Sequence, residues 1–148
     1  MSMFAKILNL FGLLPKNITV STGIQLRVRV EIADSGTKVP LGDAHIAIEQ
    51  LAKGENPERR TPLGRTDARG QLDAMASIGW TYPRHEWLMD PDASDPPPLI
   101  IAISKAGFRD ERRGFLIDSL TRESEVFQLQ LGKIALGAVP PPSPSHLS

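Results

Sequence analysis

The chain has 148 residues, about the size of one domain, so we expect a single hydrophobic core. Lysine plus arginine balances aspartate plus glutamate at 17 each, so no net field favours nucleic acid, an anionic membrane or an acidic ligand. Cysteine is absent, which excludes disulfides, thiolate nucleophiles and cysteine metal sites. Thirteen prolines and twelve glycines favour short strands joined by turns over a helical bundle.

Residues 1–16 form the most apolar stretch, and helical spacing in this stretch predicts a short apolar helix that presents Phe4, Ile7, Leu8 and Phe11. About 20 residues are needed to span a bilayer, so the segment is too short to cross one. The small residues of a signal cleavage site are missing. We therefore expect a docking segment for a protein partner, a second copy or a membrane surface. A cytoplasmic or assembly-associated location is favoured over cleaved secretion.

From Gly23 onward apolar and polar residues alternate strictly, which predicts a half-buried strand with one face made of Ile24, Leu26, Val28, Val30 and Ile32. Turn residues at 33–38 lead to a second strand over 44–49. Residues 53–62 are polar and contain proline, so they predict a loop. Strands at 63–66 and 71–77 then flank a turn in which Asp67 caps the backbone and Gly70 takes the left-handed conformation.

Three more strands are predicted at 99–104, 114–118 and 127–131, and a tail rich in proline and serine follows. The chain thus divides into the docking segment at 1–16, a β-sandwich domain at 17–136 and the tail at 137–148. About seven short strands with no strong helix after residue 16 indicate an all-β fold of two antiparallel sheets packed face to face.

Three motifs, at 39–48, 64–72 and 103–108, together resemble the carboxypeptidase-regulatory-like family. They place a proline and a Gly-Asp-Ala before an alternating strand, then a Thr-Asp-x-x-Gly hairpin, then an Ala-Gly-Phe corner. The resemblance covers about residues 22–132. It implies a prealbumin-like (transthyretin-like) or immunoglobulin-like sandwich, which usually serves as a non-catalytic accessory, adhesion or assembly unit, although a fold does not dictate function.

Enzymes with similar sandwiches offer three comparisons, and the sequence departs from each. Transthyretin-like hydrolases of 5-hydroxyisourate end in Tyr-Arg-Gly-Ser, whereas this chain ends His-Leu-Ser. Intradiol dioxygenases hold iron with two tyrosines and two histidines, but Tyr82 is the only tyrosine here. Adhesin isopeptide bonds need a late asparagine, and none follows Asn56. We therefore assign no catalytic residue and no cofactor.

Two side-chain clusters are interpreted as ordinary surface. His45, His85 and Glu86 carry groups that bind zinc, but nothing in the sequence fixes their distances, so surface histidines are preferred and no metal site is assigned. Four arginines near one hairpin are interspersed with acidic residues, which favours a solvated mixed face over nucleic-acid binding: Arg59, Arg60, Arg65 and Arg69.

Residues 79–98 predict a long connection, and long connections in compact domains are commonly functional. This one holds residue types that dominate binding hot spots, so the expected ligand or partner site is Trp80, Tyr82, Arg84 and Trp87. The alternative is that Trp80 ends a strand and Trp87 folds back over an open edge of the sandwich.

These observations predict a non-catalytic protein-interaction or assembly module and not an enzyme, and the family resemblance suggests a bacterial surface or secretion setting. The alternative from another class is a carbohydrate-binding accessory domain that stacks sugar rings on the Trp80–Trp87 loop. A small transthyretin-like hydrolase ranks last.

Overall fold

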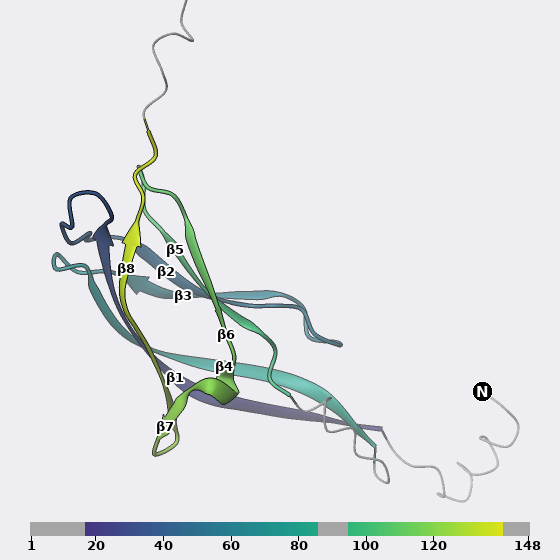
Figure 1. Cartoon of the computed structure of the whole chain (residues 1–148). Helices are drawn as coiled ribbons and strands as arrows, with labels where there is room; N and C mark the ends of the chain where they lie inside the picture. Colours follow the sequence, from purple (N-terminus) through teal and green to yellow (C-terminus); the bar gives the residue numbers. More distant parts are fainter. Residues whose placement is uncertain (1–16, 86–94, 141–148) are drawn as a thin grey trace, which may run out of the picture.

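Two four-stranded sheets packed face to face form the domain in a computed structural model, which describes residues 17–85 and 95–140 (Figure 1). For Asn17, Arg84 and His85 it describes the backbone. The elements in chain order are β1 (Asn17–Asp34), β2 (His45–Gln50), β3 (Arg59–Arg65), β4 (Gln71–His85), β5 (Leu99–Ser104), β6 (Glu111–Phe115), the 3₁₀ turn η2 (Ile117–Ser119), β7 (Thr121–Glu123) and β8 (Val126–Leu136).

The strand order is β4-β1-β8-β7 in the first sheet and β3-β2-β5-β6 in the second. The all-β sandwich prediction is confirmed, with eight described strands where about seven were expected. The expectation of purely antiparallel sheets needs a correction, because β1 and β8 pair in parallel. The reason is that the chain crosses from the second sheet to the first between β6 and β7, and the β7–β8 hairpin then places β8 beside β1 in the same direction.

The core lies between the sheets and is built by the alternation that the sequence shows. On β1 the inward positions Leu26, Val28, Val30 and Ile32 are at most 3% exposed. Strand β2 contributes Ile46 and Ile48, and the facing strands add mostly Ile and Leu. A large, continuous apolar cluster of this kind is the main source of stability in a domain that has no disulfide.

The predicted turn at Asp67–Gly70 is confirmed. Asp67 Oδ1 accepts hydrogen bonds from the amides of Arg69 at 2.9 Å and Gln71 at 3.0 Å. Gly70 has a φ of +74°, the left-handed conformation that glycine adopts without steric cost. Beside the turn, the buried Thr66 hydroxyl donates to the carbonyl of Leu41 at 2.7 Å and accepts from the amide of Ala44. The hairpin is thereby attached to the start of β2.

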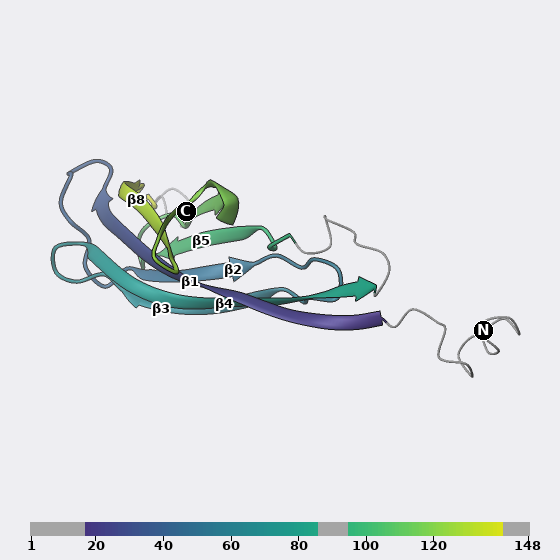
Figure 2. The ribbon, with the colours of Figure 1, turned by 90° about the horizontal axis from the view of Figure 1, so that it is seen from below.

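Strands β1 and β4 are both longer than predicted. β1 begins at Asn17, six residues before the predicted start at Gly23, and β4 continues to His85. Residues 17–24 pair with 78–85, so residues 79–85 of the predicted 79–98 loop belong to a strand. In Figures 1 and 2 the two strands continue side by side beyond the start of β8, and we call residues 17–24 and 78–85 the ribbon. Pro83 is compatible with this position because β4 is an edge strand.

Strand β8 also exceeds its prediction, which ended at 131. An irregularity in its pairing with β1 leaves Leu131 without a partner position, and Gly132 takes a φ of +65°. A bulge of this kind lets the strand continue to Leu136. The predicted apolar helix at 1–16 and the end of the tail fall outside the described residues. Among the residues that are described, no helix is long and apolar enough to cross a membrane.

Candidate functional site

A hollow lies at the end of the sandwich where β1 and β4 extend beyond the start of β8, and we call it the end cleft. Its volume is about 610 Å³, within the range typical of small-molecule sites. Its apolar lining is Ile24, Ile78, Trp80, Ile117 and Phe127, with Pro96 beside them. Thr22, Gln25, Ser77, Asp118, Arg122 and Glu125 supply its polar lining.

Two side-chain amides fix the β4 wall of the cleft. Gln50, only 5% exposed, reaches across from β2 and donates to the carbonyl of Gly79 at 3.0 Å. Asn56 accepts from the Thr81 amide at 2.8 Å and donates to the Thr81 carbonyl at 2.6 Å. These bonds hold the backbone on both sides of Trp80. A wall fixed by neighbouring hydrogen bonds offers a ligand a surface that needs little reorganisation.

Another wall comes from η2, from β7 and from the turn that leads into β8. Ile117 is buried there at 4% exposure, while Asp118, Arg122 and Glu125 are exposed. The Arg122 guanidinium lies 5.6 Å from the ring centroid of Phe127, a cation–π distance, and its Nε donates to the Ser124 carbonyl at 3.1 Å. One cation and two carboxylates thus join the uncharged polar residues and the apolar residues that line the cleft.

Two of the four predicted binding residues have side chains that the structure describes. Trp80 is 8% exposed and belongs to the core, although it also lines the end cleft. Tyr82 is half-buried against the same core and does not line the cleft. The side chain of Arg84 and all of Trp87 lie outside the described part. So do the predicted docking residues, whose role stays a prediction: Phe4, Ile7, Leu8 and Phe11.

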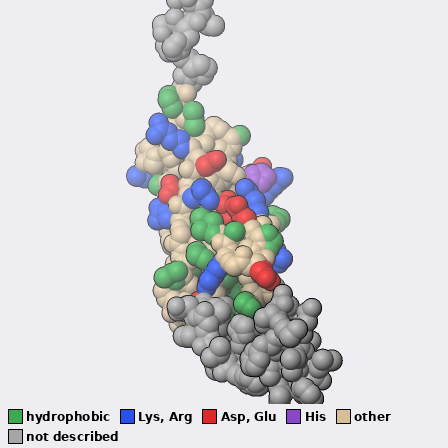
Figure 3. Space-filling model, turned by 90° about the vertical axis from the view of Figure 1, so that its right-hand side faces the viewer, with side chains coloured by type: hydrophobic (Ala, Val, Ile, Leu, Met, Phe, Trp, Pro, Cys, Tyr) green, Lys and Arg blue, Asp and Glu red, His purple; other side chains and the backbone are tan. Residues whose placement is uncertain are grey.

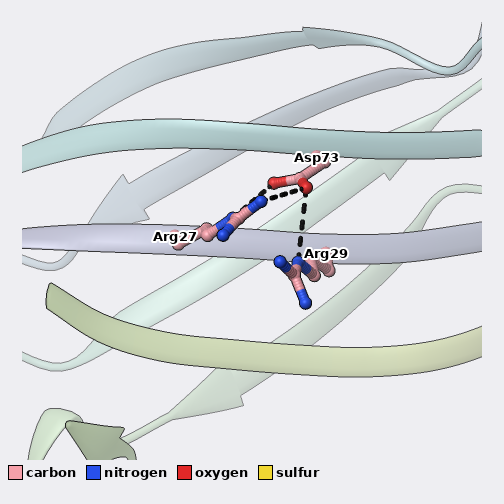
Figure 4. Close-up of polar contacts among 3 residues, drawn as sticks. All are labelled: Arg27, Arg29 and Asp73. Atoms are coloured by element: carbon pink, nitrogen blue, oxygen red, sulfur yellow. Dashed lines mark hydrogen bonds and ion pairs between the residues drawn. The ribbon is translucent and has the colours of Figure 1, made fainter. Parts of the chain in front are cut away.

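A second polar cluster lies on the outer face of the first sheet (Figure 4). Arg27 binds Asp73 with two hydrogen bonds, Nε to Oδ1 at 2.9 Å and Nη2 to Oδ2 at 2.7 Å. Arg29 reaches the same Oδ2 at 3.3 Å. The hydrogen bond from Arg27 holds the pKa of the Asp73 carboxyl below its ordinary value, and the charges of both arginines act in the same direction. All three side chains are solvent-exposed, so we treat the cluster as surface structure.

This arrangement predicts that Arg27→Gln raises the pKa of Asp73 more than Arg29→Gln does, because only Arg27 makes the bidentate bond. The folded pKa lies below the ordinary 3.8, so any stabilisation is present above that value and fades as the pH falls through the folded pKa. The measurement is an NMR titration of the Asp73 carboxyl carbon in the two variants and the wild type. Equal shifts in both variants would contradict the assignment.

The structure describes some residues of the histidine cluster and of the arginine cluster that were interpreted as ordinary surface. His45 is exposed on β2, and among the described residues no group of three or more His, Cys, Asp or Glu side chains could hold a metal ion. Arg60 and Arg112 both pair with Glu49, at 3.8 and 2.6 Å, and Arg65 pairs with Asp43 at 3.2 Å. Figure 3 shows acidic and basic side chains interspersed on the face that it draws.

No family model and no curated protein sequence matches this chain. Solved structures that resemble its fold include several dioxygenases. The 3-chlorocatechol 1,2-dioxygenase of Rhodococcus opacus has a TM-score of 0.48 at 15% identity, with 80% of this chain and 62% of that one covered. The chlorocatechol 1,2-dioxygenase of Pseudomonas putida gives 0.47 at 15%, covering 78% and 61%. Its hydroxyquinol 1,2-dioxygenase gives 0.43 at 15%, covering 80% and 58%.

These matches contradict two expectations. The chain was expected to be a non-catalytic interaction or assembly module, with carbohydrate binding as the alternative, and not an enzyme, whereas the similar solved structures are enzymes. The expectation rested on turn motifs, which specify backbone geometry and occur in sandwiches of many functions. At these identities the likeness is one of fold, and the chain spans less than two thirds of the length of the enzymes.

The described residues do not fit the iron site of intradiol dioxygenases, which uses two tyrosines and two histidines. Tyr82 lies on β4 of the first sheet, and His45 lies exposed on β2 of the second. The structure does not bring the two together. The end cleft is therefore the candidate site, and sequence analysis missed it because its walls come from four segments that are far apart in the chain.

Proposed function

We propose that this chain binds a small hydroxylated aromatic molecule in the end cleft. The observation that carries the proposal is the composition of the cleft. It is a hollow of about 610 Å³ that is lined by apolar side chains together with polar and charged ones. Small-molecule sites typically combine a predominantly apolar wall with a few polar groups that orient the ligand. Reaction chemistry is not part of the proposal.

The apolar lining favours a flat, ring-shaped body. Ile24 and Ile78 are cross-strand neighbours on β1 and β4, and Trp80 follows two positions along the same inner face. Phe127 lies on β8, the next strand of the same sheet, in register with Leu26 of β1. Aromatic rings gain from burial against such a surface and from stacking or edge contacts with Trp and Phe. A ring compound therefore fits this lining better than a flexible polar chain does.

The polar lining favours hydroxyl groups at the end of that ring. Asp118 and Glu125 offer only hydrogen-bond acceptors when ionised, and Arg122 offers only donors. A hydroxyl group both donates and accepts, so it satisfies either kind of partner. A strongly anionic ligand would meet the two carboxylates as like charges.

The proposal predicts weak, localised binding of catechol, the probe compound. At about 0.5 kcal/mol per non-hydrogen atom, eight atoms give about 4 kcal/mol, which corresponds to a Kd of about 1 mM. We expect NMR shift changes at the indole of Trp80 and at amides of Ile117 and Phe127 in the full chain. Benzoate, the anionic comparison, is expected to bind at least threefold more weakly.

A pair of tryptophan substitutions tests the location. Thr22 is exposed and lines the cleft, so Thr22→Trp should fill it and weaken catechol binding at least tenfold. Val39 is also exposed, at 55%, and lies in the turn after the C-terminal end of β1, whereas the cleft is lined by residues 22–25 of that strand, so Val39→Trp should leave binding unchanged. Absence of any shift at 10 times the expected Kd, or equal loss in both variants, would reject the proposal.

We also infer kinship with the carboxypeptidase-regulatory-like sandwiches. The support is that each of the three motifs lies at a junction between elements of the sandwich. The 39–48 motif enters β2, the 64–72 motif forms the hairpin from β3 to β4, and the 103–108 motif ends β5. A structure-based alignment with members of that family should superpose these three junctions in register, and a shift of any one by a strand position would argue against common descent.

A further inference from the structure

The first half of β1 has an open edge. Strand β4 pairs with one side of β1 along residues 17–31, but β8 pairs with the other side only from Gln25 onward. In the part of the chain that is described, no strand pairs with the outer side of residues 18–23, which we call the free edge. In Figure 2 this part of β1 runs along the margin of the molecule. An open edge presents main-chain N–H and C=O groups that another strand can bind.

The free edge lacks the protection that the other edge strands carry. Its sequence is Ile-Thr-Val-Ser-Thr-Gly, with no charge and no proline. By contrast, β3 holds Pro62 among arginines, β4 holds Pro83, and β6 and β7 each hold acidic and basic side chains. Charged residues and proline on edge strands discourage pairing with other chains. Their absence here leaves this edge suited to pairing with another strand.

Side-chain placement also suits a new strand. Ile18 and Val20 share the inner face with the core residues of β1, while Thr19 and Ser21 face outward. Ile18 is a large apolar residue that remains 48% exposed, in a strand of high β-propensity. A strand added at this edge would cover part of the apolar surface and leave the polar row in water.

We propose that the free edge pairs antiparallel with the same edge of a second copy of this chain. Two identical uncharged segments meet without like-charge repulsion, and a twofold pairing about Val20 places Ile18 of each copy beside Thr22 of the other. Inner faces remain on one side, so the first sheets of the two copies join into one continuous sheet. This is the geometry of an isologous dimer. The inference does not depend on ligand binding, although Thr22 and Gly23 belong both to the free edge and to the lining of the end cleft.

The test measures the oligomeric state of the full chain by sedimentation velocity between about 5 and 200 μM. The wild type is expected to be a reversible dimer. Ser21→Lys and Thr19→Lys place lysines of the two copies near each other, and we expect each to weaken dimerisation at least tenfold. Thr121→Lys adds the same charge on the exposed β7 and should remain dimeric, which makes it the matched control.

Hydrogen exchange keeps the test decisive if a lysine variant fails to fold. In the wild type, amides within residues 18–23 should gain protection as concentration rises, while those of the distant β6 should not. A wild type that is monomeric throughout the range would overturn the proposal. So would folded lysine variants that dimerise as the wild type does, or exchange at residues 18–23 that is independent of concentration.

Discussion

Replacement of Gly70 by valine is expected to lower the free energy of unfolding by about 2 to 6 kcal/mol, much of the stability of a small domain. Gly70 has a φ of +74°, which a β-branched residue tolerates poorly. In addition, a Cβ at this position would lie 2.3 Å from the carbonyl oxygen of Ile32 and 3.1 Å from the amide nitrogen of Leu41. Both contacts are backbone atoms, which cannot move aside as a flexible side chain would. Urea denaturation followed by circular dichroism gives the value.

Gly107→Val separates the two causes. Gly107 has a similar φ of +86°, but a Cβ there would meet nothing within 4 Å. This variant therefore carries the conformational strain alone, about 1 to 3 kcal/mol. The difference in unfolding free energy between the two variants measures the steric cost at Gly70. That cost arises because Ile32 of β1 and Leu41, which precedes β2, lie close to the hairpin turn. Equal losses would show that the steric clash is relieved by a backbone shift.

Trp80→Ala is expected to cost about 3 to 5 kcal/mol of unfolding free energy, the usual range for deletion of a large buried aromatic side chain. Trp80 is 8% exposed within the core, and its neighbours Gly79 and Thr81 are held by Gln50 and Asn56. The surrounding backbone is thus fixed and poorly able to collapse into the space. Chemical denaturation should be followed by circular dichroism, because the substitution removes a fluorophore.

Trp80→Phe serves as the control because it retains a ring and should cost clearly less. The comparison also decides between the two sequence hypotheses for this residue. A large loss of stability identifies Trp80 as a core residue at the end of the sandwich. Unchanged stability would instead support the hypothesis that it is a surface residue for binding.

Alternation along β1 made much of the fold predictable. Four inward positions of this strand are apolar and its outward positions are polar, a period that only a half-buried strand satisfies. The hairpin turn was equally accessible because Asp67 and Gly70 act on the backbone within a few residues. Both features depend on chemistry that is local in sequence.

The ribbon and the cleft were not predictable from local pattern. Residues 17–24 and 78–85 contain Gly23, Gly79 and Pro83, which usually interrupt strands, and their pairing depends on a partner far away in the chain. The cleft depends on where β8 begins relative to β1, which is a property of three-dimensional register. Function was misjudged for a related reason, since turn motifs report how a chain bends and not what its surface binds.

The parallel pairing of β1 with β8 has a consequence for how the chain reaches its native state. The two strands form neighbouring central positions of one sheet, yet Gln25 and Val126 are separated by roughly a hundred residues. During synthesis β1 can pair with β4 early. The side of β1 that pairs with β8 stays unpaired until β8 has left the ribosome. High contact order of this kind slows folding, so refolding should be slow for a domain of this size. Until β8 arrives, one side of β1 has no strand partner, which makes this interval the period of greatest risk of misassembly.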